Sequence, residues 1–296
     1  MPRPTTPRRL GPRSPRAEAA QRLLTQRLTD ARQAREKLGR TLEPEAVHDL
    51  RVATRRLRAA LKVFRPLGSL KSLEDAVKHL QDALGQVRDI HVQADWLTRS
   101  AQERKPARRE GLEALRSSVE SHLGARERHL RRALEQWTKR TVPALQRDAQ
   151  RLEGQGRYGD KESRKPLLHR LRQMKRHMKE YVNAPHPLLA HQLRKSVKKL
   201  RYEAELFHPA RPDDMDEFLE ELEPLQEVLG DLHDADVRME LLARFMSEGT
   251  VTQRNAARKL MTQVSEERAK HAARIDHELH RWRARNRFQQ LRRLLK

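Results

Sequence analysis

The stretch that decides the fold is VHDLRVATRRLRAALKVF at residues 47–64, which the chain repeats at residues 190–207 as AHQLRKSVKKLRYEAELF. Both copies have a histidine followed three residues later by an arginine, and both end in phenylalanine. A second pair of segments follows them, LQDALGQVRDIHV at 80–92 and LQEVLGDLHDADV at 225–237. We interpret the chain as an internal duplication with a period of roughly 145 residues, far longer than the repeats of solenoid proteins.

Wound as an α-helix, residues 47–64 have two distinct faces that lie next to each other. The apolar face carries Val47, Leu50, Thr54, Leu57, Leu61 and Phe64. The basic face carries His48, Arg51, Arg55, Arg58 and Lys62. A solvated face would lie opposite the apolar one. A basic face beside the core instead lies where neighbouring helices meet, so the pattern predicts a cleft or pore lined by cations.

The second copy repeats this basic face with His191, Arg194, Lys198 and Arg201, while Glu205 stands where the first copy has Lys62. Within each face, four potential cations span about 15 Å of helix, and no acidic residue interrupts them. Arg56 projects away from the basic face and is interpreted as an ordinary surface charge. Because the pattern occurs twice, with its histidine, we expect one anionic ligand held from two sides.

Composition supports an anionic partner. The 296-residue chain has a net charge of +23, is 35% charged and contains 4% aromatic residues. Self-repulsion of this size favours binding to nucleic acid, an anionic membrane surface or an inorganic polyanion. The chain has no cysteine, which excludes disulfides, thiol catalysis and cysteine-ligated metal and fits a reducing cytosol. No apolar stretch is long enough to span a membrane, and the N-terminus lacks a signal-peptide pattern.

Helical periodicity runs through most of the chain, which predicts an all-α fold. We expect a disordered basic arm at residues 1–15, a first half at 16–151, a glycine-containing linker at 152–165 and a second half at 166–296. The predicted helices are 16–38, 44–64, 73–99 and 106–139 in the first half, and 166–182, 188–207, 213–246 and 250–288 in the second. Four helices in each half predict two four-helix bundles, related by a pseudo-twofold axis around a basic central cavity.

The residue types point to a phosphate chain more than to nucleic acid. Arginine presents a planar fork of donors that suits phosphate oxygens. The basic faces lack interleaved aromatics, which single-stranded nucleic-acid binders use to stack bases. Non-specific nucleic-acid binding stays open, because it also depends on backbone electrostatics. The two histidines can bind phosphate when protonated or donate a neutral N–H.

We expect no enzymatic activity, no cofactor and no metal site. The chain has no phosphate-binding Walker loop, zinc-protease motif or dinucleotide fingerprint. Two His-Asp doublets, His48-Asp49 and His233-Asp234, are not repeated at the equivalent positions of the other half. The repeated glycines, Gly85 and Gly230, predict close helix packing or a kink. The repeated aspartates that follow them, Asp89 and Asp234, are expected to cap a helix or to orient a basic-face arginine.

The paired HxLRxxxRRLR and HxLRxxxKKLRY motifs, with the paired LGxxRD and LGxxHD motifs, resemble the CHAD family, the conserved histidine α-helical domain. The resemblance covers about residues 16–288. It implies a basic central cavity that binds inorganic polyphosphate, and it adds Arg56 and Lys199 to the basic-face residues as binding positions. The chain lacks the ExExK motif of the triphosphate-tunnel domain that many relatives carry, so it resembles the stand-alone form.

The sequence therefore predicts a cytoplasmic polyphosphate-binding protein that acts without catalysis. A non-specific nucleic-acid binder and an adaptor on polyphosphate or other storage granules are the alternatives. Further cavity residues are expected from the other helices, and the candidates are Arg27, Arg131, Lys175 and Arg281.

Overall fold

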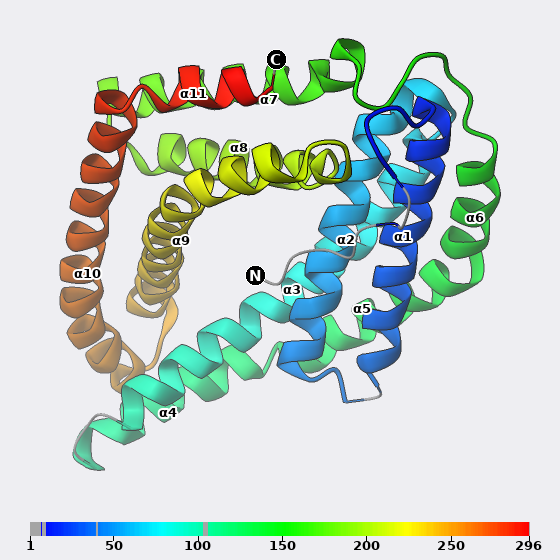
Figure 1. The fold of residues 1–296 in the computed structure, drawn as a ribbon. Coiled ribbons are helices and arrows are strands. Elements are labelled where there is room, and N and C mark those ends of the chain that lie inside the picture. The colour runs from blue at the N-terminus through cyan, green and yellow to red at the C-terminus, as the bar shows by residue number, and fades with distance from the viewer. Residues whose placement is uncertain (1–6, 8–9, 40, 103–105, 296) are drawn as a thin grey trace.

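The computed structural model describes residues 7, 10–39, 41–102 and 106–295, and within these ranges the chain is helical without a β-strand (Figure 1). The helices of the first half are α1 (Arg16–Lys37), α2 (Pro44–Phe64), α3 (Lys71–Gln102), α4 (Pro106–Glu120), α5 (Leu123–Gln136) and α6 (Val142–Gln150). Those of the second half are α7 (Lys161–Asn183), α8 (Pro187–Ala204), α9 (Pro212–Glu248), α10 (Val251–Ala284) and α11 (Arg287–Leu294). Short turns occur at Arg65–Leu67, Trp137–Thr141 and His208–Ala210.

Local sequence sets several helix boundaries. Proline occupies the first turn of α2, α8 and α9, where its missing N–H costs no helical hydrogen bond. The α10 helix begins with a capping box, in which Thr250 and Gln253 satisfy each other's backbone N–H groups. The predicted bounds of α2 are correct, and those of α1 differ by one residue.

Two of the predicted long helices are wrong. The helix expected at 106–139 is divided into α4 and α5 and then continues beyond Pro143 to Gln150. A π-helical turn at Trp137–Thr141 precedes this proline, and such a wide turn accommodates a residue that has no N–H and crowds the preceding turn. The helix expected at 250–288 ends at Ala284, and Asn286, with φ of 49°, turns the chain into α11.

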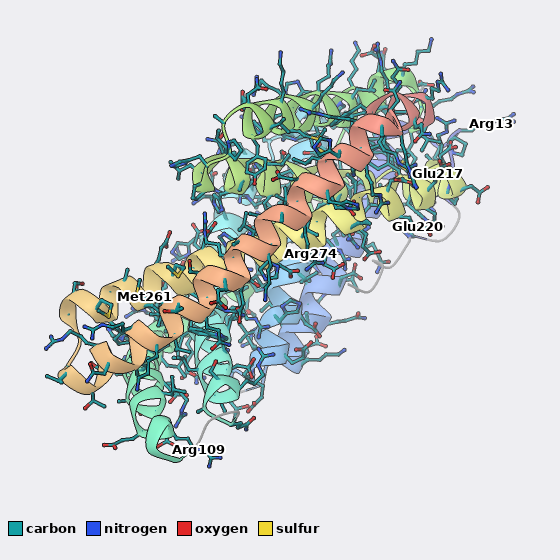
Figure 2. The ribbon with its side chains drawn as sticks, turned by 90° about the vertical axis from the view of Figure 1, so that its left-hand side faces the viewer. Arg13, Arg109, Glu217, Glu220, Met261 and Arg274 are labelled. Carbon is teal, nitrogen blue, oxygen red and sulfur yellow. The ribbon has the colours of Figure 1, made fainter. Side chains whose placement is uncertain are left out.

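The halves are not two regular four-helix bundles. In the first half α2 packs between α1 and α3, α5 lies against α3, and α6 lies against α1. In the second half α7 and α8 run across the top of Figure 1, whereas α10 and the later part of α9 run down its left side. Figure 2 shows α10 crossing over α9, to which the ion pair between Arg274 and Asp231, 2.9 Å long, joins it.

Apolar packing joins the two halves in two places. The main core runs from α1, α2 and α3 through α5 and α6 to α7, α8 and α9. A second, smaller core lies where the end of α3 and α4 meet the end of α9 and the beginning of α10. Its buried members are Trp96, Leu97, Leu112, Leu115, Ala235, Leu241, Leu242, Ala257, Leu260 and Val264. Because α4 packs on α10, part of the first half is buried against the second.

The segment expected to be a linker is partly buried. Leu152 and Tyr158 lie in the main core, and the Tyr158 ring stacks on Phe207 with 5.8 Å between ring centroids. The Tyr158 hydroxyl donates a hydrogen bond to the Leu206 carbonyl. The α7 helix begins at Lys161 rather than at the expected residue 166. A segment that buries a tyrosine between the halves does not separate them as a flexible linker would.

The described part of the expected N-terminal arm is paired with this segment. Tyr158 donates its N–H to the Ser14 carbonyl at 2.9 Å, and Gly159 donates to Pro12 at 2.9 Å. A Cβ at Gly159 would lie 2.7 Å from the Pro12 Cβ, so the absence of a side chain at this glycine allows the two segments to approach each other. Residues 10–15 are therefore attached to the fold. Residues 1–6 and 8–9 lie outside the described residues, and their disorder stays a prediction.

No helix in the described ranges is both long and apolar enough to cross a membrane.

Candidate functional site

The two repeated segments form α2 and α8, and these helices pack against each other. Their apolar faces are buried in the main core, as the sequence predicts for Leu50, Leu57, Leu193 and Leu200. Nε of Arg56 on α2 lies 2.9 Å from Oε2 of Glu205, just after α8, and this ion pair fixes the register of the two segments. The basic faces therefore meet although they are far apart in sequence.

Four cations form the centre of this contact: Arg51 and Arg55 from α2, and Arg194 and Lys198 from α8. We call these four residues the cationic cluster. Each member lies in the electrostatic field of at least one cation from the other helix. All four side chains are partly exposed. Within the described part of the chain none of them forms an ion pair, and Nε of Arg194 is buried without a hydrogen-bond partner.

Burial, together with neighbouring cations, lowers the pKa values of Arg51, Arg194 and Lys198. Burial, followed by the neighbouring Arg55, lowers the pKa of Arg51 to about 10. Burial, followed by Arg194, Arg55 and Arg51, lowers the pKa of Lys198 to about 7. The pKa of Arg194 is also lowered, mainly by burial. Cations held in this way are stabilised by any anion that enters between them.

Two carboxylates, Asp89 on α3 and Asp234 on α9, lie near the cluster and only partly balance its charge. The negative charge of Asp89 raises the pKa values of Arg51 and Arg194, and that of Asp234 raises the pKa values of Arg194 and Lys198. Burial raises the pKa of the Asp89 carboxyl although water reaches this side chain.

The histidines flank the cluster, and their pKa values are lowered. Burial, then Arg88, lowers the pKa of His48, and burial, then Lys195, lowers that of His191. His233 on α9 stacks on His191 with 5.0 Å between ring centroids, and burial beside Arg194 lowers its pKa to about 3. In the free protein these lowered pKa values favour the neutral form, and the role of the histidines beside a phosphate stays a prediction. Among the described residues, no group of histidines and carboxylates is arranged to hold a metal ion.

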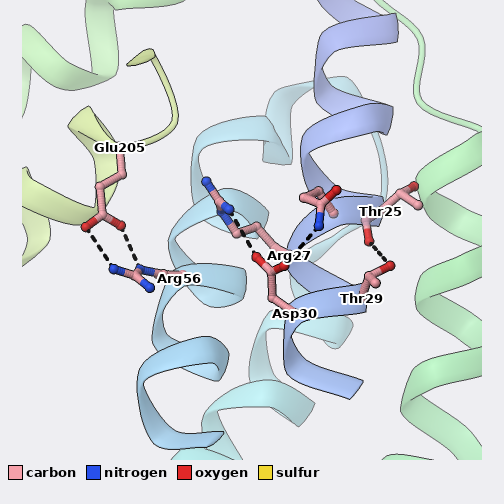
Figure 3. A network of polar contacts seen from close by, with 7 residues as sticks. Thr25, Arg27, Thr29, Asp30, Arg56 and Glu205 are labelled. Atoms are coloured by element: carbon pink, nitrogen blue, oxygen red, sulfur yellow. Dashed lines mark hydrogen bonds and ion pairs between the residues drawn. The ribbon is translucent and has the colours of Figure 1, made fainter. Parts of the chain in front are cut away.

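Arg56 is not the surface charge that we expected. It is 8% exposed, and its guanidinium makes two hydrogen bonds to Glu205, of 2.9 and 3.3 Å (Figure 3). Arg27, a candidate cavity residue, belongs to the same buried network, since it bonds to Asp30 at 3.2 Å and lies in the field of Glu205. Arg56 joins α2 to the segment just after α8, and the charge of Glu205 also attracts Arg27 from α1.

Carboxylates also neutralise the C-terminal ends of the basic faces. Arg58 and Lys62 lie 3.5 and 3.4 Å from Oε1 of Glu74, which is buried on α3. Arg201 lies 3.6 Å from Glu205 and 3.7 Å from Glu223. The structure therefore divides each basic face into a C-terminal part with carboxylate partners and an N-terminal part that forms no ion pair with the residues the structure describes.

Lys199 belongs to a smaller basic group beside the cluster. It is exposed and lies in the field of Arg170, Lys62 and Lys195, and burial together with these cations lowers its pKa. Arg170 from α7 donates to Glu203 at 2.6 Å, so this group is partly neutralised.

The other candidates from outside the repeated segments have local partners. Arg131 pairs with Glu127 at 3.7 Å, and Arg281 pairs with Glu278 at 2.8 Å. The Lys175 ammonium lies 5.7 Å from the centroid of the Phe288 ring. No described contact brings these three side chains to the cluster.

Three neighbours of the cluster were not predicted from the sequence: Arg88, His233 and Lys195. Arg88 and His233 occupy equivalent positions of the second repeated motif, one residue before the repeated aspartates. The charge of Arg88 helps to lower the pKa of His48 in the first half, and the His233 ring stacks on His191 in the second. This equivalence was visible in the sequence and would have identified both residues.

No neighbouring helix backbone in the described ranges lies close to the repeated glycines. A Cβ at Gly85 would meet only the Arg51 guanidinium, at 3.7 Å, and a Cβ at Gly230 would meet nothing within 4 Å. The prediction of helix packing at these glycines is therefore wrong. Gly85 leaves space beside the Arg51 guanidinium.

The model of the CHAD domain family matches residues 17–243. In structure, the chain is similar to the CHAD domain from the plant Ricinus communis, with 25% identity, a TM-score of 0.74 and coverage of 95% of this chain and 96% of that one. It is also similar to PptA from Streptomyces chartreusis, with 17% identity, a TM-score of 0.62 and coverage of 90% and 100%. None of the curated proteins matches the chain.

Proposed function

Because this chain belongs to the CHAD domain family, we propose that it binds inorganic polyphosphate in the cationic cluster and performs no chemistry on it. The observation that carries the proposal is the meeting of Arg51, Arg55, Arg194 and Lys198 from two helices, without ion-pair partners among the described residues. Such a site has a high electrostatic cost when empty, and a chain of phosphates would relieve it along its whole length.

The surroundings of the cluster favour a ligand made of phosphate groups alone. Tyr202 is the aromatic side chain that interacts electrostatically with Arg51 and Arg194. It is 8% exposed and offers little surface for stacking a base. Arginine forks and neutral histidine N–H groups bind phosphate oxygens without a base. We infer that the cluster lines a basic central cavity, and that the equivalent contacts of α2 with α3 and of α8 with α9 reflect a pseudo-twofold duplication.

Titration with long-chain polyphosphate tests this function. Changing Arg51, Arg55, Arg194 and Lys198 together to alanine should abolish saturable binding. The matched control removes four exposed cations that pair with acids on their own helix or helical turn, Lys71, Lys78, Arg99 and Lys139. Retained binding in the cluster variant, or equal loss in the control, would reject the site.

Salt dependence gives an independent measure of the contacts. Counterion release on single strands gives a slope of about −0.7 per phosphate contacted, so four contacts predict a slope of roughly −3 in a plot of log affinity against log salt. The cluster variant should lose most of this slope, whereas the matched control should keep it.

Nucleic acid is the main alternative ligand, since the excess of cations attracts any polyanion. Competition separates the two. Polyphosphate should displace duplex DNA at equal phosphate concentration, and duplex DNA should not displace polyphosphate. We also propose a cytoplasmic location on polyphosphate granules, which fluorescence microscopy with and without polyphosphate synthesis would test.

A further inference from the structure

Lys198 differs from the exposed lysines of the chain. It shares its helix face with Arg194, one turn earlier on α8, and Arg51 and Arg55 lie near it on α2, the helix that packs against α8. The carboxylate that acts on it is Asp234 from α9, and no described ion pair neutralises its ammonium. Its side chain remains partly accessible to water. An amine in this position is open to small reagents and surrounded by groups that attract anions.

We propose that Lys198 is an acylation site for acyl phosphates, whose phosphate group is bound by the arginines of the cationic cluster. The Lys198 nitrogen attacks the carbonyl carbon of the reagent, and a C–N amide bond forms. The bond between that carbon and the phosphate oxygen breaks, inorganic phosphate leaves, and the nitrogen loses a proton to water. No other reactant is needed. This inference rests on one part of the proposed function, namely that the cluster binds phosphate groups.

The charge environment supplies the nucleophile that this step needs. With a pKa of about 7, roughly three-quarters of the Lys198 amine is neutral at pH 7.5, against about one in a thousand for an ordinary lysine. Lower basicity reduces the reactivity of each neutral amine, so only part of this gain survives. Binding of the phosphate group by Arg51, Arg55 and Arg194 adds proximity, which the exposed lysines lack.

Acylation would change the cluster itself. An amide carries no charge and cannot take up a proton when the anion binds, so polyphosphate binding to a protein acylated at Lys198 should weaken. Bound polyphosphate, in turn, should protect the lysine, because it occupies the arginines and favours the charged amine. The site would therefore respond to the balance between acyl phosphates and polyphosphate.

The test is a time course of the full chain with acetyl phosphate at pH 7.5, with acetylation of each lysine measured by peptide mass spectrometry. Lys195 is the internal reference, because it is exposed and lies one turn earlier on the same helix. We expect Lys198 to react at least about tenfold faster than Lys195. Equal rates at the two lysines would overturn the proposal.

A second reagent separates phosphate guidance from a merely reactive amine. Succinimidyl acetate transfers the same acetyl group without a phosphate. Arg55→Met and Arg194→Met should each lower the ratio of the acetyl phosphate rate to the succinimidyl acetate rate at Lys198. An unchanged ratio would reject guidance by the arginines, and a misfolded variant would show itself by altered succinimidyl labelling throughout the chain.

Competition distinguishes this inference from the proposed function. Inorganic phosphate at millimolar concentration should protect Lys198 from acetyl phosphate, and polyphosphate should protect it at lower phosphate concentration. If polyphosphate neither binds nor protects while inorganic phosphate does, the proposed function fails and the acylation site stands. If neither anion protects Lys198, the acylation site fails whatever the titration with polyphosphate shows.

Discussion

Polyphosphate affinity should fall as the pH rises from 7.5 to 8.5, because Lys198 must take up a proton when the anion binds. In the free protein, burial and then Arg194, Arg55 and Arg51 lower its pKa to about 7, and Asp234 opposes them. A phosphate beside the amine favours the charged form and raises this pKa. Below pH 7 the lysine is charged in both states, so affinity is highest there and decreases above it.

The size of the effect follows from the two pKa values. If binding returns the Lys198 pKa to its ordinary value of about 10.4, the dissociation constant rises about eightfold between pH 7.5 and 8.5. A bound pKa of only about 9 still gives about a sixfold rise. At pH 8 the free lysine is about one-tenth charged, so binding should take up about 0.9 proton per site.

Isothermal titration calorimetry in two buffers of different ionisation enthalpy measures both quantities. Long polymer minimises terminal phosphates, whose second pKa of about 6 lies below the chosen range. Lys198→Arg is the matched variant, because its guanidinium stays charged throughout, and its affinity should change little from pH 7.5 to 8.5. Lys139→Arg, at an exposed lysine paired with Glu135, should behave like the wild type. The reasoning fails if the wild type shows no proton uptake or if Lys198→Arg keeps the full pH dependence.

Three further predictions concern stability, and denaturant unfolding checks each of them. Glu205→Gln should destabilise the protein by about 3–5 kcal/mol, because the buried Arg56 and Arg201 both lose the carboxylate charge of Glu205, and the double change Arg56→Met with Glu205→Leu should restore only part of the loss, since Arg201 still lacks this partner. Leu242→Ala should cost about 2–5 kcal/mol through a cavity in the smaller core and leave polyphosphate affinity unchanged, so an altered affinity would show that this core shapes the site. Gly230→Ala should stabilise the fold by roughly 0.5–1 kcal/mol, since nothing lies within 4 Å of the added methyl group, and a loss of stability would contradict that open space.

The sequence was most informative where structure is local. Proline in the first turn and a continuous apolar stripe were enough to place α2 at residues 44–64. Where the outcome depended on a compensating turn, as at Pro143, the sequence predicted an end and the structure continued the helix. The glycines of the supposed linker illustrate the same limit. Glycine favours flexibility, but Gly159 serves a close approach to Pro12 that only distant pairing could create.

By itself the sequence determined that the chain is helical and that two helices carry the same histidine-led row of cations, because both properties depend on residues within a few turns of one another. Tertiary structure decided which of those cations remain without ion pairs. Glu205 and Glu74 reach Arg56, Arg58 and Lys62 from other parts of the chain, whereas no described carboxylate pairs with the cationic cluster. Electrostatic compensation acts through space, and distance in space depends on how the helices pack.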